Sequence, residues 1–356
     1  MPPPLLLHVF STFAVGGPQM RFAAIANQCG DRLRHAVVAM DGVLAARERL
    51  DPGLGVTFPP VLVGKGDLAG NLRRFAAVLG TLRPDLLVTY NWGSIEWAMA
   101  NVLMRRRHVH IEDGFGPEER SRQLPRRVLT RRLVLRRTAV VLPSRTLFGI
   151  ARDVWRLPER RLRYIPNGID LARFTPAPPG APGAPPVIGT VAALRAEKNL
   201  ARLLAALAQL PAARLVIVGD GPERGRLAAQ AAALGIAGRV TFAGAQADPA
   251  AAYRGFDLFA LSSDTEQMPL SVLEAMASAL PVAASDVGDV AAMLAAANRP
   301  FVVTQDAGAL AAALAALLAD PARRAAIGAA NRARAEAEFD AARMLAAYAE
   351  LFGAVA

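Results

Sequence analysis

The chain has 356 residues, of which 53% are hydrophobic, so it is long enough for about two domains with apolar cores and lacks the composition of a disordered protein. Its net charge of +11 arises within residues 101–163, where 17 Arg stand against six Asp and Glu, and such a patch attracts anionic partners. The single cysteine excludes an internal disulfide, and no apolar run reaches the length of about 18 residues that a transmembrane helix needs.

Short apolar runs alternate with amphipathic stretches in the first half of the chain. The opening residues, MPPPLLLHVF, lack the basic region and cleavage site of a signal peptide and predict a strand. Strands that alternate with helices pair in parallel, so this half predicts a doubly wound sheet. The predicted strands are 5–10, 35–40, 85–90, 108–111 and 139–142, and the predicted helices are 18–28, 67–82, 94–106, 118–137 and 144–155.

A proline-rich stretch divides the chain at residues 175–186. Its sequence, TPAPPGAPGAPP, contains six prolines and two glycines, which favour a semi-rigid linker over a helix or a strand. Beyond the linker the alternation resumes, and residues 321–352 predict one long helix. The sequence thus predicts two α/β domains, 1–174 and 187–339. The strands predicted for the second are 187–191, 214–218, 239–242, 257–261, 281–284 and 301–303.

Two glycines, Gly16 and Gly17, follow the first predicted strand and precede Pro18, which can start a helix. Glycines at this place let the backbone approach a ligand, and the start of a helix favours an anion. The full G-x-G-x-x-G spacing is missing, so a simple turn from strand to helix is an equal alternative.

Arg195 and Lys198 lie in the segment LRAEKNL, after the first strand of the second half. The chain contains only two lysines, Lys65 and Lys198, beside 39 arginines, which indicates that a compact point charge is needed at Lys198. Two cations after a strand can hold a diphosphate and stabilise the charge that develops on it as it leaves. Lys65 is interpreted as an ordinary loop residue.

Two glutamates lie in the segment 264–276, DTEQMPLSVLEAM, directly after an apolar strand. Pro269 is tolerated only near the start of a helix, so Glu266 belongs to the loop and Glu274 to the second helical turn. Two carboxylates can accept hydrogen bonds from the hydroxyl groups of a sugar and of a ribose. The turn formed by Met268, Pro269 and Leu270 adds unpaired N–H donors at the start of the helix. Parallel sheets bind ligands at the carboxyl ends of their strands, so we expect these motifs to meet in one groove between the domains.

Taken together, the motifs resemble the retaining GT-B glycosyltransferases with an E-x7-E motif, glycosyltransferase family 4 (group 1). The resemblance covers nearly the whole chain. The matching segments are Gly16-Gly17, PDLLVTYNWG at 84–93, IPNGIDLARF at 165–174, RAEKN at 195–199, VGDGPE at 218–223, the E-x7-E motif at 266–274 and EAMASALPVAASDVG at 274–288.

The resemblance implies two Rossmann-like domains that face each other, with the last helix, about 340–356, returning to the first. It implies that Arg195 and Lys198 bind the donor diphosphate, with Gly17 close to it, that Glu274 holds the ribose, and that Glu266 contacts the transferred sugar. It also implies transfer with retention and without a metal or cofactor, the nucleotide sugar being a substrate. We favour a UDP-sugar because UDP is the commonest donor nucleotide in such enzymes.

The chain departs from the family pattern at two places. Pro269 stands where the family usually has Gly, and it removes a donor that could have reached the sugar. The family often has a His at the end of a central strand, and His110 or Asp113 could occupy that place. Both are therefore candidate catalytic residues, with Glu112 and Gly16 as secondary candidates near the groove.

The basic segment 105–163 indicates which kind of acceptor the enzyme uses. Residues 125–137, PRRVLTRRLVLRR, predict a helix with an apolar side surrounded by arginines, which can lie on an anionic bilayer or present a solvated basic face. Bacterial relatives often act on lipid-linked acceptors. We therefore expect a cytoplasmic enzyme, peripheral on the inner face of the membrane, that transfers sugar to a glycan or lipid-linked acceptor in cell-surface polysaccharide or glycolipid synthesis.

Other functions compete with this hypothesis. A nucleotide-sugar epimerase would use the same cleft without an acceptor, whereas a phosphorylase would need a pyridoxal phosphate lysine in an apolar setting, which neither lysine has. A nucleic-acid-binding protein fits the pI of about 11.0, but no known module and no interleaved aromatic residues are present. A dinucleotide-dependent oxidoreductase would need the missing glycine fingerprint.

Overall fold

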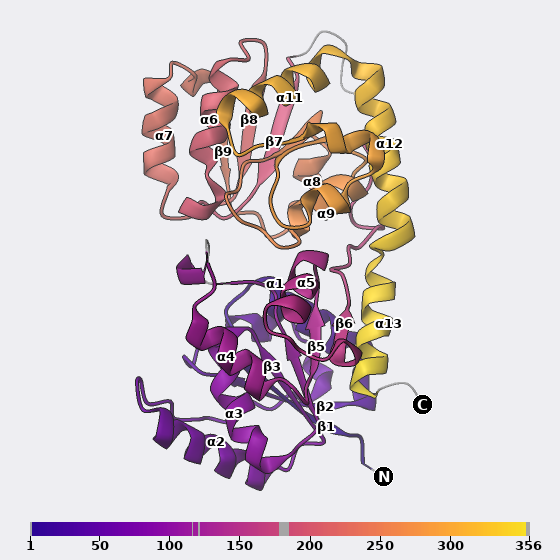
Figure 1. Ribbon diagram of the computed structural model, residues 1–356. Coiled ribbons are helices and arrows are strands. Elements are labelled where there is room, and N and C mark those ends of the chain that lie inside the picture. Colours follow the sequence, from indigo (N-terminus) through magenta and orange to yellow (C-terminus); the bar gives the residue numbers. More distant parts are fainter. Residues whose placement is uncertain (1, 116, 120–121, 178–184, 354–356) are drawn as a thin grey trace. The chain divides into compact units, whose positions relative to one another are not determined.

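A computed structural model describes residues 2–115, 117–119, 122–177 and 185–353, and the chain divides into two compact units. The first unit comprises Met1–Pro166 and Met344–Ala356, and the second comprises Asn167–Arg343 (Figure 1). The predicted boundary at 174 differs from this division, because Ile169 and Phe174 are buried in the core of the second unit. Most of the predicted linker, residues 178–184, lies outside the described residues.

The first unit is built on a sheet of six strands in the order β2-β1-β3-β4-β5-β6, all paired in parallel. The edge strand β6 was not predicted, because it has only three residues and two of them are exposed. The strands are β1 (Leu5–Phe10), β2 (Arg34–Ala39), β3 (Leu86–Tyr90), β4 (His108–Ile111), β5 (Ala139–Leu142) and β6 (Leu162–Tyr164).

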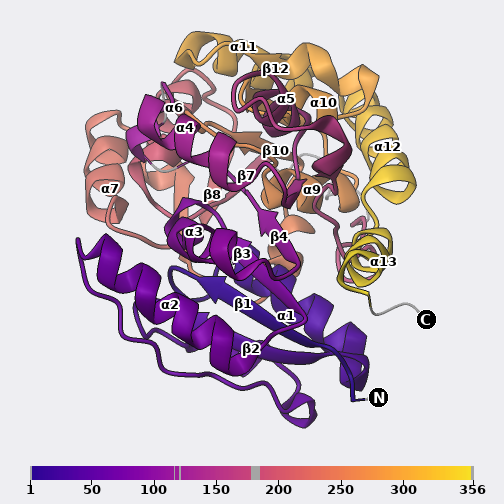
Figure 2. The same cartoon turned by 60° about the horizontal axis from the view of Figure 1, so that its bottom comes forward.

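Helices cover both faces of this sheet. Phe22 of α1 and Tyr348 of α13 share one core cluster, while Phe75 of α2 and Trp97 of α3 stack in the cluster on the opposite face (Figure 2). The predicted helix 118–137 is wrong at its start: residues 117–119 form a short 3-10 turn, and the helix begins only at Pro125, a residue that fits the first turn of a helix but not its interior. The helices are α1 (Gly17–Cys29), α2 (Leu68–Leu82), α3 (Ile95–Met104), α4 (Pro125–Val134), α5 (Arg145–Asp153) and α13 (Ala341–Phe352).

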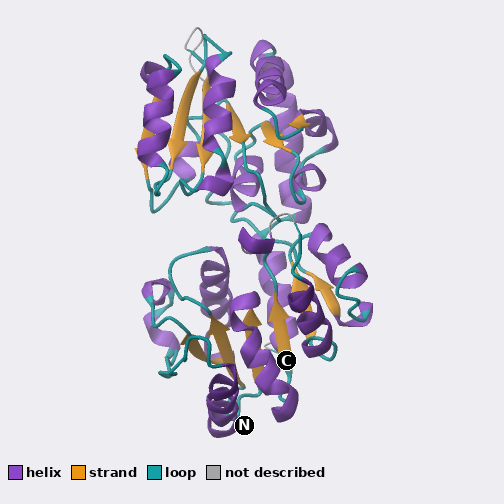
Figure 3. Cartoon of the chain, turned by 60° about the vertical axis from the view of Figure 1, so that its left-hand side comes forward, coloured by secondary structure: helices purple, strands orange, loops and turns teal. Residues whose placement is uncertain are grey.

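The second unit repeats the architecture with a parallel sheet in the order β12-β11-β10-β7-β8-β9 between two layers of helices (Figure 3). Leucines of α6 and α11 pack on one face, and residues of α8 and α9 pack on the other. The strands are β7 (Val187–Val191), β8 (Arg214–Val218), β9 (Val240–Gly244), β10 (Leu258–Leu261), β11 (Val282–Ser285) and β12 (Val302–Val303). The helices are α6 (Leu200–Ala208), α7 (Arg224–Ala233), α8 (Ala250–Tyr253), α9 (Leu270–Ala277), α10 (Val290–Met293), α11 (Ala307–Ala319) and α12 (Pro321–Glu338).

The predicted helix 321–352 is two helices, α12 and α13, separated at Phe339 and Asp340. The backbone N–H of Ile169 donates to the carbonyl of Phe339 at 2.8 Å, and the N–H of Ala341 donates to the carbonyl of Ile169 at 3.0 Å. These bonds replace the helical ladder at the break. Met344, Tyr348 and Phe352 of α13 are then buried in the core of the first unit. Among the residues that the structure describes, no helix has the length and apolarity to cross a bilayer.

Candidate active site

The loop that carries Arg195 follows β7 and is held by two glycines of the VGDGPE segment. A Cβ at Gly219 would lie 1.9 Å from the carbonyl oxygen of Ala192, and a Cβ at Gly221 would lie 2.5 Å from that of Leu194. The backbone N–H of Leu194 donates to the carbonyl of Asp220 at 2.9 Å. Only glycine permits this approach of the two loops, so the segment fixes the backbone before Arg195.

Lys198 and Glu266 meet in the second unit, although they are 68 positions apart. The ammonium Nζ of Lys198 lies 2.5 Å from Oε1 of Glu266, which also accepts a hydrogen bond from the Ser263 hydroxyl at 2.7 Å. Their side chains are 26% and 10% exposed. The pair is thus partly desolvated but open to a ligand, and a low dielectric strengthens the field of its cation.

A second ion pair, between Arg202 and Asp264, is formed by residues close in sequence to Lys198 and Glu266. Asn199 adopts a left-handed conformation with φ 40°, and its amide donates to Oδ1 of Asp264 at 2.9 Å. Arg202 donates to the same oxygen at 2.7 Å, and the N–H of Asp264 donates to the carbonyl of Glu197 at 2.9 Å. Sequence reasoning missed Arg202 and Asp264. The neighbouring Asn199, a residue type that tolerates the left-handed region, was the available signal.

The backbone around Glu266 is also fixed from a distance. Gly288 has φ 54°, and a Cβ there would lie 2.3 Å from the carbonyl oxygen of Glu266. The N–H of Asp289 donates to the carbonyl of Gln267 at 2.9 Å, and the amide of Asn167 donates to the carbonyl of Met268 at 3.0 Å. The backbone of loop 264–268 is therefore held by residues 288–289 and by Asn167, in addition to its bond with Glu197.

Glu274 lies on the second turn of α9, which begins directly after Pro269. Its Oε2 accepts a hydrogen bond from the Tyr253 hydroxyl at 2.6 Å, and within the described part of the chain Oε1 has no partner. Burial raises the pKa of Glu274, and the bond from Tyr253 opposes the shift. Tyr253 retains its proton because burial and the carboxylate raise its pKa well above the usual value. One oxygen of Glu274 is thus oriented and the other can accept a ligand hydroxyl.

The remaining site residues predicted in the second unit are Arg195, Met268, Pro269 and Leu270. Arg195 is exposed, and among the described residues its guanidinium has no hydrogen-bond or ionic partner. Met268 is buried, while Leu270 is 37% exposed as the first residue of α9. Pro269 precedes the helix in an extended conformation, at a position where its missing N–H removes no helical hydrogen bond.

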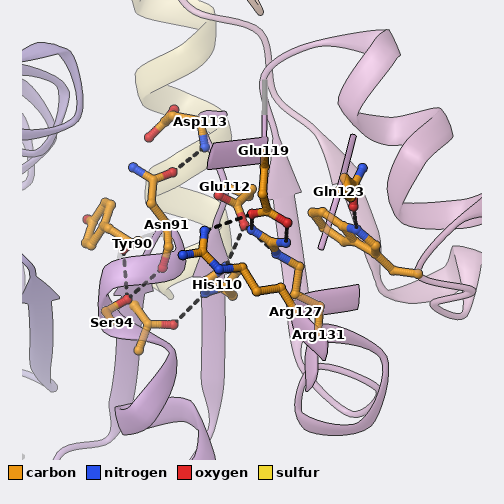
Figure 4. Close-up of polar contacts among 12 residues, drawn as sticks. Tyr90, Asn91, Ser94, His110, Glu112, Asp113, Glu119, Gln123, Arg127 and Arg131 are labelled. Carbon is orange, nitrogen blue, oxygen red and sulfur yellow. Dashed lines mark hydrogen bonds and ion pairs between the residues drawn. The ribbon is translucent and has the colours of Figure 1, made fainter. Parts of the chain in front are cut away.

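In the first unit, the side chain of His110 is completely buried. Its Nδ1 lies 2.8 Å from the hydroxyl of Thr89, and its Nε2 lies 3.6 Å from Oε2 of Glu112 (Figure 4). With no exposed surface, this imidazole touches no ligand in the conformation observed. A catalytic role for His110 stays a prediction.

Glu112 was expected near the groove, but its side chain is wholly buried in an ionic network. Its Oε2 accepts a hydrogen bond from Nε of Arg131 at 3.2 Å. The two Nη atoms of Arg131 donate to the two carboxylate oxygens of Glu119 at 3.2 and 3.1 Å (Figure 4). The guanidinium carbon of Arg131 lies 4.9 Å from the ring centres of Trp92 and Trp155. The burial of Arg131 contradicts the alternative in which the arginines of this helix form a solvated face, whereas the alternative with an exposed apolar side remains a prediction. Arg131 faces the core, whereas Leu129 and Leu133 are 55% and 66% exposed.

Asp113 follows the same strand and retains some exposed surface. Its carboxylate accepts two hydrogen bonds from Arg21 at 2.7 and 2.8 Å, and its N–H donates to Oδ1 of Asn91 at 2.6 Å. Of the two candidates for the family His, Asp113 is the more accessible one, but its charge is already neutralised by Arg21. Gly16 and Gly17 lie at the start of α1, a helix of 13 residues.

Within the described ranges, no group of three or more His, Cys, Asp or Glu side chains could hold a metal ion. Lys198, whose ammonium contacts Glu266, is a cation of this site that can bind phosphate.

The doubly wound sheets of the two units are those of GT-B glycosyltransferases, as the comparison with solved structures shows. Residues 173–334 match the family model described as "Glycosyl transferases group 1", and residues 15–173 match "Glycosyltransferase Family 4". The chain belongs to the group 1 glycosyltransferases, which confirms the fold class, the family and the hexosyltransferase activity predicted from the motifs.

Individual relatives have varied names. The chain is 29% identical to a 2-deoxystreptamine N-acetyl-D-glucosaminyltransferase of Streptomyces fradiae over 77% of this chain and 76% of the relative. It is 30% identical to a D-inositol 3-phosphate glycosyltransferase of Segniliparus rotundus over 67% of this chain and 62% of the relative. The structure of Anabaena HepE in complex with UDP and glucose superposes with a TM-score of 0.83 at 22% identity, covering 99% of this chain and all of HepE.

Proposed function

We propose that this glycosyltransferase uses a nucleotide-diphosphate sugar, with a UDP-sugar favoured, and transfers the sugar with retention and without a metal. The observation that carries the proposal is the contact between Lys198 and Glu266, which puts a cation for phosphate beside a carboxylate for sugar hydroxyls. HepE, a structural neighbour, has been solved with UDP and with UDP-glucose, which supports the choice of nucleotide.

In this proposal the diphosphate binds Arg195 and Lys198. As the bond between the sugar and the phosphate breaks, negative charge builds on the departing phosphate, and the Lys198 ammonium stabilises it more strongly than in the bound donor. Glu266 already holds the ammonium in place, and it turns its carboxylate toward the hydroxyls of the transferred sugar. The departing phosphate accepts the proton of the acceptor hydroxyl.

The ribose is held by Glu274. The bond from Tyr253 fixes one carboxylate oxygen, and the other accepts from a ribose hydroxyl. A carboxylate held in one orientation loses little entropy on binding, which adds to donor affinity.

The acceptor is proposed to be a glycan or a lipid-linked saccharide of cell-surface polysaccharide or glycolipid synthesis. The exposed Leu129 and Leu133 lie in the Arg-rich segment 105–163, and this combination supports peripheral binding to the inner, anionic face of the cytoplasmic membrane. Binding should weaken with salt. Equal sedimentation with neutral and anionic vesicles would exclude the membrane part of the proposal.

A thermal-shift panel tests the donor. UDP and then a set of UDP-sugars should raise the melting temperature more than GDP and GDP-sugars, because a ligand that binds only the folded state stabilises it. Incubation with donor alone, followed by product analysis, separates transfer from epimerisation. An epimerised nucleotide sugar formed without acceptor would favour the epimerase instead.

A further inference from the structure

Six arginines gather at the edge of the first unit's sheet where strands begin. Arg105, Arg106 and Arg107 directly precede β4, Arg136 and Arg137 precede β5, and Arg161 precedes β6. Because these three strands are parallel neighbours, the loops that lead into them meet at one edge (Figure 1). Parallel sheets bind their substrates at the opposite edge, where strands end, so this cluster is separate from the substrate edge of the unit.

The six arginines line a cavity of about 600 Å³, a volume in the range typical of ligand sites. Apolar side chains complete its wall, among them Leu86, Val134 and Leu351. No acidic side chain is among the described residues that line it. The cavity is therefore lined by both cationic and apolar side chains.

The arginines of this cavity differ from many others in the chain. Arg127 and Arg131 have carboxylate partners close by, whereas among the described residues none of the six cavity guanidinium groups makes a hydrogen bond or an ion pair. The backbone of Arg106 is held in place by Asn101. The side chain of Asn101 donates to the carbonyl of Arg106 at 3.0 Å and accepts from its N–H at 3.0 Å. Its Nε is nevertheless buried without a partner.

Several cations held together repel one another, and an unpaired buried donor costs free energy. Both costs are removed when an anion with many oxygens binds. Guanidinium groups recognise phosphate through paired N–H donors, which makes phosphate the best match for this donor set.

We propose that this cavity is a second anion site that binds a phosphate-dense group, either a free oligophosphate or the phosphate head group of a lipid. The site is independent of the nucleotide-sugar residues of the second unit. Val102 and Leu103, the second 83% exposed, stand on the end of α3 beside the arginines, where an acyl chain would meet apolar side chains.

Calorimetric titration of the full-length protein with sodium tripolyphosphate tests the site. In the variant Arg136→Gln/Arg137→Gln, the part of the binding due to the cavity should weaken about tenfold or more, since charge-assisted hydrogen bonds are lost. The matched control Arg73→Gln/Arg214→Gln removes two exposed arginines outside the cavity and should bind like the wild type. UDP affinity should be equal in all three proteins, which shows that the donor site and the fold persist.

Vesicles identify the source of the phosphate. Sedimentation with phosphatidylglycerol vesicles that falls in the cavity variant but not in the control assigns the site to a lipid head group. Loss of tripolyphosphate binding with unchanged sedimentation assigns it to a free oligophosphate. If both probes bind the cavity variant and the control equally, or if neither binds the wild type, the proposal is wrong, whatever the outcome for sugar transfer.

Discussion

Lys198→Ala should abolish most sugar transfer while leaving the fold intact. The ammonium of Lys198 is 2.5 Å from Glu266 and only 26% exposed, so its charge is weakly screened by solvent. Removing one such group that stabilises developing charge lowers kcat by about 10²–10³, which corresponds to about 3–4 kcal/mol of transition-state stabilisation. The effect should fall on kcat more than on KM, because the charge on the departing phosphate grows in the transition state.

The chain supplies a matched control, since Lys65 is its only other lysine. Steady-state release of UDP from the donor chosen by the thermal-shift panel, measured with acceptor, compares Lys198→Ala with Lys65→Ala. Circular dichroism melts verify folding. Turnover within a factor of about three of the wild type in Lys198→Ala would refute the assigned role, because a lost charge-assisted contact costs more than that.

Glu266→Gln separates two roles for the carboxylate. The glutamine side chain can still accept the hydrogen bond from the Ser263 hydroxyl, but it has no negative charge to attract the Lys198 ammonium. If Glu266 serves only to position Lys198, this variant should share the kcat loss of Lys198→Ala, and the double variant should lose little more, as coupled residues are not additive. If Glu266 also binds the sugar, the double variant should be clearly worse.

Three further changes test other parts of the site. Glu274 has a raised pKa, so its contribution to stability is present at low pH and lost as the pH rises through that pKa. Glu274→Gln should therefore raise the melting temperature more at about pH 8 than at about pH 4, while lowering UDP affinity in calorimetry. Arg131→Met leaves the buried Glu112 without an arginine partner and Glu119 with Arg127 alone, and it should cost about 3–5 kcal/mol in urea unfolding, against about 0–1 kcal/mol for the exposed Glu118→Gln. Gly288→Ala should displace the loop of Glu266 and reduce kcat, whereas Gly235→Ala, also at positive φ but with open space around it, should affect only stability.

Much of the fold could be predicted because its signals are local. Buried parallel strands are short apolar runs, and amphipathic helices separate them, so the sequence predicts both sheets apart from the three-residue edge strand β6. The site segments were found for a related reason. They follow directly after strands, where Lys198 and Glu266 stand out by residue type.

What the sequence did not predict depends on contacts between distant segments. Arg131 is buried because two carboxylates and two tryptophans surround it, whereas its local pattern predicts an exposed face. Ile169 joins the second unit because it pairs with the backbone at Asp340. Gly288 supports Glu266 from 22 positions away, and no pattern within either segment indicates the contact.

The affinity difference between UDP and uridine tests the central claim most directly, because it isolates the diphosphate. We expect UDP to bind the wild type at least about 100-fold more tightly than uridine, since two cations each add a charge-assisted contact. Arg195→Gln/Lys198→Ala should remove most of that advantage. Equal affinities for UDP and uridine in the wild type, or an unchanged advantage in the double variant, would contradict the account.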